Sequence, residues 1–275
     1  MKATAMLATA LVCGATVARA QEVSEQRVRA AVDDAARGLG QTVAGGSPMT
    51  APAATTGGLG HFLVSVGVGV TRVEIEDPQR ETGTTDFFLP SAGARLALGI
   101  TDGIPSGGAI QGFGSVDLLG RVGLMAARDQ IEEAAKLYGL GVRVGLLSET
   151  ALSPAVSVSL ERAWTEEVAF GEPDEISFRG DVAVTSIRAD LSKSFVLIAP
   201  YVGAGIDRTQ IDASYTIPEE FSTAGQEIHG SIDPSSTHHT LYAGIDLSLL
   251  LLSGSLEAGI YDGGAFAAFA VRAGL

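Results

Sequence analysis

Ten charged side chains occupy the same kind of position in this chain, each among small residues that alternate with an apolar row. They are Arg95, Asp117, Arg121, Arg143, Glu161, Arg188, Asp190, Asp246, Glu257 and Arg272. Because side chains of a β-strand alternate between its two faces, these charges would project from one face of a sheet. If the sheet closes into a barrel, they meet in its lumen, where unpaired charges are costly. Two interpretations stay open: a ladder of ion pairs that fills a narrow lumen, or a polar constriction that selects solutes.

The histidines are the other side chains that could do chemistry: His61, His229, His238 and His239. The adjacent pair at 238 and 239, together with Asp233 and Glu227, could bind a metal ion weakly. Adjacent histidines in a loop are more often simply solvated. We therefore expect no resident metal ion and no cofactor.

Sequence signatures of enzymes are sparse. The chain contains no H-E-x-x-H, G-x-S-x-G, phosphate-loop or EF-hand spacing. His239 with Asp207 or Asp262 is the one acid–base pair that a hydrolase or acyltransferase at a barrel rim could use. We expect the protein not to be an enzyme.

The elements that must position these side chains are strands with a two-residue period. Residues 241–251 illustrate it, with Leu241, Ala243 and Ile245 on one side and Tyr242 and Asp246 on the other. Similar runs occur at residues 61–73, 92–100, 114–124, 138–146, 155–164, 178–191, 196–206, 256–260 and 269–275. An apolar row opposite a small or charged row is typical of strands that face lipid outside and a polar lumen inside. The pattern predicts an all-β, antiparallel transmembrane barrel of about ten strands, with eight to twelve compatible.

The connections between these runs alternate in length and charge. The longer set, at residues 74–91, 126–137, 165–177 and 207–240, is rich in Asp and Glu. Long outer loops and short periplasmic turns are the rule in bacterial outer-membrane barrels. Residues 211–217 in the longest connection predict an additional small hairpin. The last run should pair with residues 61–73 and close the barrel.

Aromatic residues near the run ends predict two interfacial girdles. Phe62, Phe113, Phe195 and Tyr201 would form the periplasmic one. Tyr138, Trp164, Phe178 and Tyr261 would form the outer one.

Residues 1–20 read as a cleavable secretory signal peptide, with Lys2, an apolar stretch and an A-x-A site at residues 18–20. Its removal would take away Cys13, the single cysteine. Residues 22–39 have helical periodicity, and Gly38 suits a C-terminal cap. Residues 21–59 are thus expected to form a periplasmic helix followed by a linker or a lumen plug, ahead of a barrel at residues 60–275.

Charge excludes one class of partner. The chain has 18 Lys and Arg against 32 Asp and Glu, with a formal net charge of −14. Nucleic acid is not an expected ligand, because phosphate binding needs basic surface. The acidic outer loops could instead contact small solutes or divalent cations.

With this pattern the chain resembles small, porin-like outer-membrane β-barrels of Gram-negative bacteria, over roughly residues 60–275. The resemblance implies export to the outer membrane, with membrane lipid and the assembly machinery as partners. Three hypotheses follow. The first is a narrow channel or transporter for small or apolar solutes. The second is a structural or surface-interaction barrel with a closed lumen, and the third is a soluble periplasmic barrel that binds a ligand.

Overall fold

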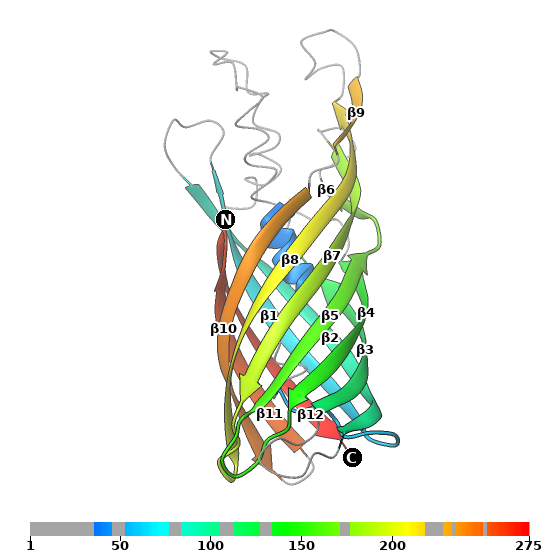
Figure 1. The fold of residues 1–275 in the computed structure, drawn as a ribbon. Coiled ribbons are helices and arrows are strands. Elements are labelled where there is room, and N and C mark those ends of the chain that lie inside the picture. The colour runs from blue at the N-terminus through cyan, green and yellow to red at the C-terminus, as the bar shows by residue number, and fades with distance from the viewer. Residues whose placement is uncertain are drawn as a thin grey trace.

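A long antiparallel sheet closes on itself to form a barrel in the computed structural model (Figure 1). The structure describes residues 36–45, 53–76, 84–104, 113–126, 134–170, 177–217, 228–232, 235–249 and 252–274. The strands of its wall are β1 (Phe62–Glu76), β2 (Thr84–Ile104), β3 (Phe113–Met125), β4 (Ala135–Leu147), β5 (Ala155–Thr165), β7 (Ser177–Ser192), β8 (Ile198–Ile217), β10 (Ser235–Leu249), β11 (Leu252–Tyr261) and β12 (Gly264–Gly274). Each wall strand pairs with its neighbours in the chain, and β12 pairs with β1. The predicted ten-strand antiparallel barrel and its closure are confirmed within the described residues.

Two short strands extend the wall at one end. β6 (Val168–Phe170) pairs with β7, and β9 (Ile228–Ile232) pairs with the end of β8. The β8–β9 pair is the small hairpin expected around residues 211–217. Several wall strands are longer than the apolar alternation predicts, because backbone pairing continues after the strand leaves the apolar band. β7 and β8 are joined by a tight turn in which Val196 has a positive φ of 57°, so β8 begins later than residue 196.

Alternation places one row of each strand outside and the other inside. On β1, for example, the outward Val68 is 56% exposed, whereas the inward Ser65 is 1% exposed. Outward valine, leucine, isoleucine and phenylalanine side chains with this degree of exposure occur on all ten wall strands in the described residues. So large an exposed apolar surface is unfavourable in water and suits the lipid acyl region. The chain is an outer-membrane β-barrel, and its exterior does not fit the soluble alternative.

The two ends of the barrel differ. The start of β1 and the end of β12 lie at one end, together with the short β7–β8 turn (Figure 1). The opposite end carries the short strands β6 and β9, and the stretches of sequence between its strands are longer, as between Ile217 of β8 and Ile228 of β9. By the rule of short periplasmic turns and long outer loops, the end with the termini of the wall faces the periplasm. We call the opposite end the outer end.

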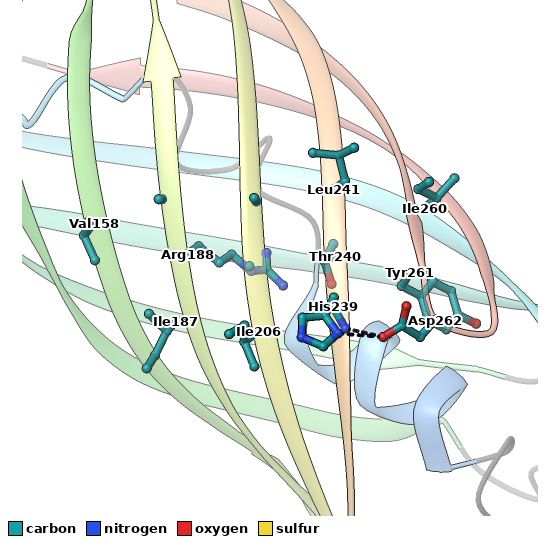
Figure 2. Close-up of a pocket in the computed structure, with 13 residues that line it drawn as sticks. Val158, Ile187, Arg188, Ile206, His239, Thr240, Leu241, Ile260, Tyr261 and Asp262 are labelled. Carbon is teal, nitrogen blue, oxygen red and sulfur yellow. Dashed lines mark hydrogen bonds and ion pairs between the residues drawn. The ribbon is translucent and has the colours of Figure 1, made fainter.

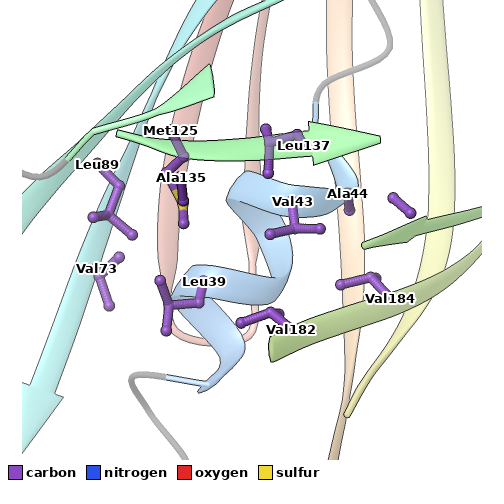
Figure 3. Packing of buried hydrophobic residues seen from close by; sticks show 11 residues of the cluster. Leu39, Val43, Ala44, Val73, Leu89, Met125, Ala135, Leu137, Val182 and Val184 are labelled. Carbon is purple, nitrogen blue, oxygen red and sulfur yellow. The ribbon is translucent and has the colours of Figure 1, made fainter. Parts of the chain in front are cut away.

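A helix of residues 36–44 lies inside the barrel, near its outer end (Figures 1 and 3). The predicted cap at Gly38 is wrong, because the helix continues through this residue to Ala44 and is followed by Gly45 with a φ of 67°. Gly38 instead allows a close approach to the wall, where an added Cβ would overlap the side chain of Val73. Residues 22–35 of the predicted helix lie outside the described residues. No helix in the described part of the chain is long and apolar enough to cross a membrane.

An apolar ring of the wall surrounds this helix (Figure 3). Leu39, Val43 and Ala44 of the helix pack against it. The wall contributes Val73, Leu89, Met125, Ala135, Leu137, Ala163, Val182 and Val184. These inward apolar side chains would face water if the helix left, so their burial holds the helix in the outer end of the lumen.

A charge within the apolar ring should expel the helix without unfolding the wall, because the strands pair without it. We expect Val43→Asp to raise the labelling rate of a Thr42→Cys reporter at least about tenfold, since burying a valine contributes roughly 1.5–3 kcal/mol. Thr42 is 2% exposed in the native structure. Maleimide labelling of folded protein, with Cys13 replaced by Ser, measures the rate.

Val43→Ala serves as the apolar control and should change the labelling rate less. Rapid labelling of Thr42→Cys in the otherwise native chain would contradict a seated helix.

Candidate functional site

The inner wall carries all ten of the charges that alternation places on the lumen face. Each is buried or largely shielded, and eight of them are less than 9% exposed as residues. Each of the five arginines in this set lies within ion-pair distance of a carboxylate. Pairing of this kind is what allows so many charges to be buried in a narrow space.

Glu161 on β5 lies at the centre of one group of charges. Its Oε1 lies 3.0 Å from Nη2 of Arg95 and 3.1 Å from Nε of Arg121. Nη1 of Arg121 also donates a 2.6 Å hydrogen bond to the carbonyl oxygen of Ala44, at the end of the helix. This arginine therefore connects the charged wall to the segment that fills the lumen.

Asp117 on β3 forms a second connection, nearer the periplasmic end. It accepts hydrogen bonds from Nε and Nη2 of Arg143 at 2.9 and 2.6 Å. It also accepts from the Thr56 hydroxyl at 2.7 Å and from the Thr56 amide at 3.2 Å. One carboxylate thus pairs with a wall cation and holds the chain that precedes β1.

Two further contacts attach the same stretch to the wall. The Thr55 hydroxyl donates to the Ser115 hydroxyl at 2.8 Å, and the Ala53 amide donates to the Ser192 hydroxyl at 3.0 Å. Residues 36–45 and 53–58 therefore lie within the lumen at its two ends. We call these two stretches together the plug segment.

A third group includes two residues that were not among the ten charges. Asp207 on β8 lies 3.5 Å from Nη2 of Arg188 and 3.5 Å from Nε2 of His238. The Thr240 hydroxyl lies 2.8 Å from Asp207 and 3.1 Å from Oε1 of Gln41 on the helix. Both residues continue the inward rows of β8 and β10, so the two-residue period of these strands predicts their position on the inner face.

Four inward charges of the original ten remain, and they belong to strands β7, β10, β11 and β12. Arg272 pairs with Asp246, which also accepts a hydrogen bond from the Ser255 hydroxyl at 3.1 Å. Asp190 accepts a 2.6 Å hydrogen bond from the Tyr242 hydroxyl. Glu257 is buried at 1% exposure on the inner face of β11.

The predicted aromatic girdles are only partly correct. Tyr201 and Tyr261 lie inside the lumen, packed with Tyr242 and Phe266, and not at the two rims. The reason is space: the Tyr201 ring lies against Gly244, where a Cβ would overlap it, and the Tyr242 ring lies against Gly203 in the same way. By contrast, Phe62, Phe113, Phe195 and Trp164 do lie on the exterior. The Phe178 side chain is outside the described part of the structure.

The adjacent histidines lie on opposite sides of the wall and cannot share a metal ion. His238 is fully buried in the lumen, whereas the side chain of His239 is 70% exposed on the exterior. Asp233 and Glu227 lie outside the described residues. Within the described residues, no group of three or more His, Cys, Asp or Glu side chains is arranged to hold a metal ion.

His239 and Asp262 are brought together at the outer end (Figure 2). Nδ1 of His239 lies 2.9 Å from Oδ2 of Asp262, which also accepts a 2.8 Å hydrogen bond from the His239 amide. Asp262 belongs to the β11–β12 turn, and these hydrogen bonds lower the pKa of its carboxyl group. Of the two acid partners expected for His239, the structure brings Asp262 to it, whereas Asp207 faces the lumen on the other side of the wall.

No protein-family model matches the sequence, and no curated protein matches it at a significant level. Among solved structures, the outer membrane protease OmpT from Escherichia coli is 8% identical with a TM-score of 0.41, and the match covers 78% of this chain and 94% of that one. Ail of Yersinia pestis is 14% identical with a TM-score of 0.36, covering 78% and 97%. The translocator domain of the autotransporter NalP from Neisseria meningitidis is 10% identical with a TM-score of 0.42, covering 93% and 99%. At these values the matches carry no information on activity.

Loss of the carboxylate between Arg95 and Arg121 should strongly destabilise the barrel. We expect Glu161→Gln to lower the free energy of unfolding by about 3–5 kcal/mol, because two buried guanidinium groups lose their shared anion. Guanidinium unfolding in lipid vesicles, followed by Trp164 fluorescence, measures the change.

Glu167→Gln is the matched control. Glu167 pairs with Arg179 at 3.8 Å, and both side chains are more than 60% exposed, so we expect a change below about 1 kcal/mol. Equal effects of the two substitutions would show that the buried ion pairs do not stabilise the fold.

Proposed function

We propose that the protein is a gated outer-membrane channel for small solutes, closed at rest by its own plug segment. The observation that carries the proposal is the fit between plug and wall. Inward glycines lie where the plug passes: a Cβ on Gly99 would overlap the carbonyl oxygen of Gly58, and one on Gly145 would lie 3.2 Å from the Thr55 side chain. The lumen is therefore shaped for a separate piece of chain, and not filled by wall side chains alone.

The connectivity of the plug supports its release. The plug segment precedes β1 and takes part in none of the strand pairings that close the barrel. It can therefore leave the lumen while every pair of wall strands stays intact. The wall contacts at residues 53–56 are hydrogen bonds that water can replace at modest net cost.

The apolar ring sets the direction of the equilibrium. Exposing both Leu39 and Val43 costs about 3–6 kcal/mol by the usual value for a buried aliphatic side chain. A cost of this size keeps the open state below about 1% of the population. The resting protein is then nearly closed, and anything that weakens the plug contacts should increase conduction.

The second candidate function is a structural barrel with a permanently closed lumen. The pairing of each of the five inward arginines of the wall with a carboxylate favours it, because such a ladder stabilises a narrow wall whether or not solutes pass. The two candidates differ in one respect, which is whether conductance depends on the position of the plug.

Removal of the Arg121 guanidinium should increase the open probability. Arg121→Ala deletes the hydrogen bond to Ala44 and leaves Glu161 paired with Arg95. Loss of a charge-assisted hydrogen bond of about 1.5–3 kcal/mol predicts openings that are roughly tenfold or more as frequent. Single-channel recording in planar bilayers measures this, and an unchanged trace from correctly folded protein would remove Arg121 from the gate.

A disulfide between plug and wall should lock the channel closed. The Thr55 and Ser115 hydroxyl oxygens are 2.8 Å apart, so Thr55→Cys with Ser115→Cys places two sulfurs in reach of one another. In the Arg121→Ala background we expect oxidation to abolish openings and reductant to restore them.

The control is a disulfide that spares the plug. Thr150 and Ser153 in the β4–β5 turn have hydroxyls 2.7 Å apart, and their replacement by Cys should leave conductance insensitive to reductant. Openings that persist in the oxidised Thr55/Ser115 variant would show that the plug is not the gate. Silence in every variant would favour the structural barrel.

A further inference from the structure

Two arginines lie close together on the exterior, on either side of strand β7. Arg162 of β5 and Arg208 of β8 are both opposite Thr185 of β7 in the strand register. Nη1 of Arg162 lies 3.3 Å from the Thr185 hydroxyl, whereas Arg208 has no ion-pair partner within the described part of the chain. Positive charge on the lipid-facing side of a barrel is costly unless a counter-charge reaches it.

A groove begins at these arginines and continues over apolar wall. Its polar part is a hollow of about 330 Å³ that also includes Gln210. A larger hollow of about 640 Å³ extends toward β10 and β11 and shares Ile187 and Ile206 with the first (Figure 2). The larger part is hollowed because Ala189 and Ala204, which form its floor, have small side chains and lie opposite each other in the register.

The arginines lie at the depth of the lipid headgroups. Trp164 is the next outward residue after Arg162 on β5, and its ring stacks with Tyr138 at a centroid distance of 6.4 Å. Tryptophan and tyrosine concentrate at the membrane–water interface. Arg208 lies opposite Thr237, near the outer end of β10. The cationic part of the groove is therefore interfacial, and the apolar part lies deeper.

We propose that this groove binds an anionic, phosphate-bearing membrane lipid of the outer leaflet. The lipid phosphate lies between Arg162 and Arg208, and an acyl chain lies along the groove over Ala189 and Ala204. Guanidinium groups suit phosphate oxygens because they present several donors in a fixed plane. A free phosphate ion would use the arginines and leave the apolar hollow unfilled, so the combined shape favours a lipid.

Charge complementarity supports this occupant. The chain as a whole is acidic, with a formal net charge of −14, yet no carboxylate is among the described residues that line the polar end of the groove. On β7 and β8 the next outward carboxylates are Asp181 and Asp212, which lie opposite each other farther toward the outer end. Asp262, at the far side of the groove, already accepts hydrogen bonds from His239. The arginine pair attracts an anion, and the carboxylates beyond it repel the anion. Together they fix the depth of the anion along the barrel wall.

Trp164 makes the site directly measurable, because it is the only tryptophan of the chain. The full-length protein is reconstituted in vesicles that mix phosphatidylcholine and phosphatidylglycerol, with bromine on the acyl chains of one lipid at a time. Quenching of Trp164 then gives the relative binding constant of the two lipids at this position. We expect phosphatidylglycerol to be preferred about fivefold or more, the effect of at least one interfacial arginine.

The double substitution Arg162→Gln with Arg208→Gln should reduce this preference to about one. The matched control is Arg72→Gln, which removes another exterior arginine that is already paired with Asp86 at 2.6 Å and should leave the preference unchanged. These surface changes spare the lumen, and heat-modifiable gel migration verifies that each variant is folded.

Three results would overturn the proposal. They are equal quenching by the two lipids in the native protein, a preference that survives the double substitution, and loss of the native preference on addition of inorganic phosphate. The last result would assign the arginines to a free anion. None of these outcomes depends on whether the barrel conducts solutes.

Discussion

Compensation of buried arginine charge is the constraint on which the interior of this barrel depends. Closure of the sheet turns every second residue inward, and the strands place Arg95, Arg121 and Arg188 where water has little access. A buried cation without a partner would cost more than the wall could offset. Glu161 and Asp207 meet that requirement. Two plug contacts lie at these ion pairs: Arg121 also donates to the carbonyl oxygen of Ala44, and the Thr240 hydroxyl beside Asp207 also lies 3.1 Å from Gln41.

Two kinds of interaction hold the plug segment, one at the outer end of the barrel and one toward the periplasmic end. At the outer end an apolar ring encloses Leu39 and Val43, which gives a non-directional contribution proportional to the area buried. Toward the periplasmic end, Thr55 and Thr56 form directional hydrogen bonds with Ser115 and Asp117. The apolar contribution is lost when water enters, whereas water can replace much of the hydrogen bonding at Thr55 and Thr56. The apolar ring therefore supplies most of the free-energy cost of opening, and the Arg121–Ala44 hydrogen bond adds to it. The contacts of Thr55 and Thr56 determine where the plug returns.

Local alternation in the sequence was sufficient to predict the wall, but not the filling of its lumen. The alternation from Leu241 to Leu249 specified which side of β10 faces lipid, because register and burial follow the same two-residue period. The position of the plug could not be obtained in this way. Gly38 looks like a cap in sequence, and only the nearby Val73 shows that it serves a close approach. The inward position of the Tyr201 ring depends in the same way on a distant residue, because Gly244 on a neighbouring strand provides the space for it.

The central claim is that the plug is seated in the lumen and opens independently of the wall. Hydrogen exchange of backbone amides in lipid-reconstituted, full-length protein tests this most directly. The account predicts that amides of residues 40–44 are protected by a factor of about 10² to 10⁴, the value that corresponds to exposing Leu39 and Val43, while amides of β1 and β12 exchange far more slowly. Exchange of the helix amides at the rate of an unstructured peptide would contradict a seated plug. Exchange of helix and strands together would contradict an independent opening.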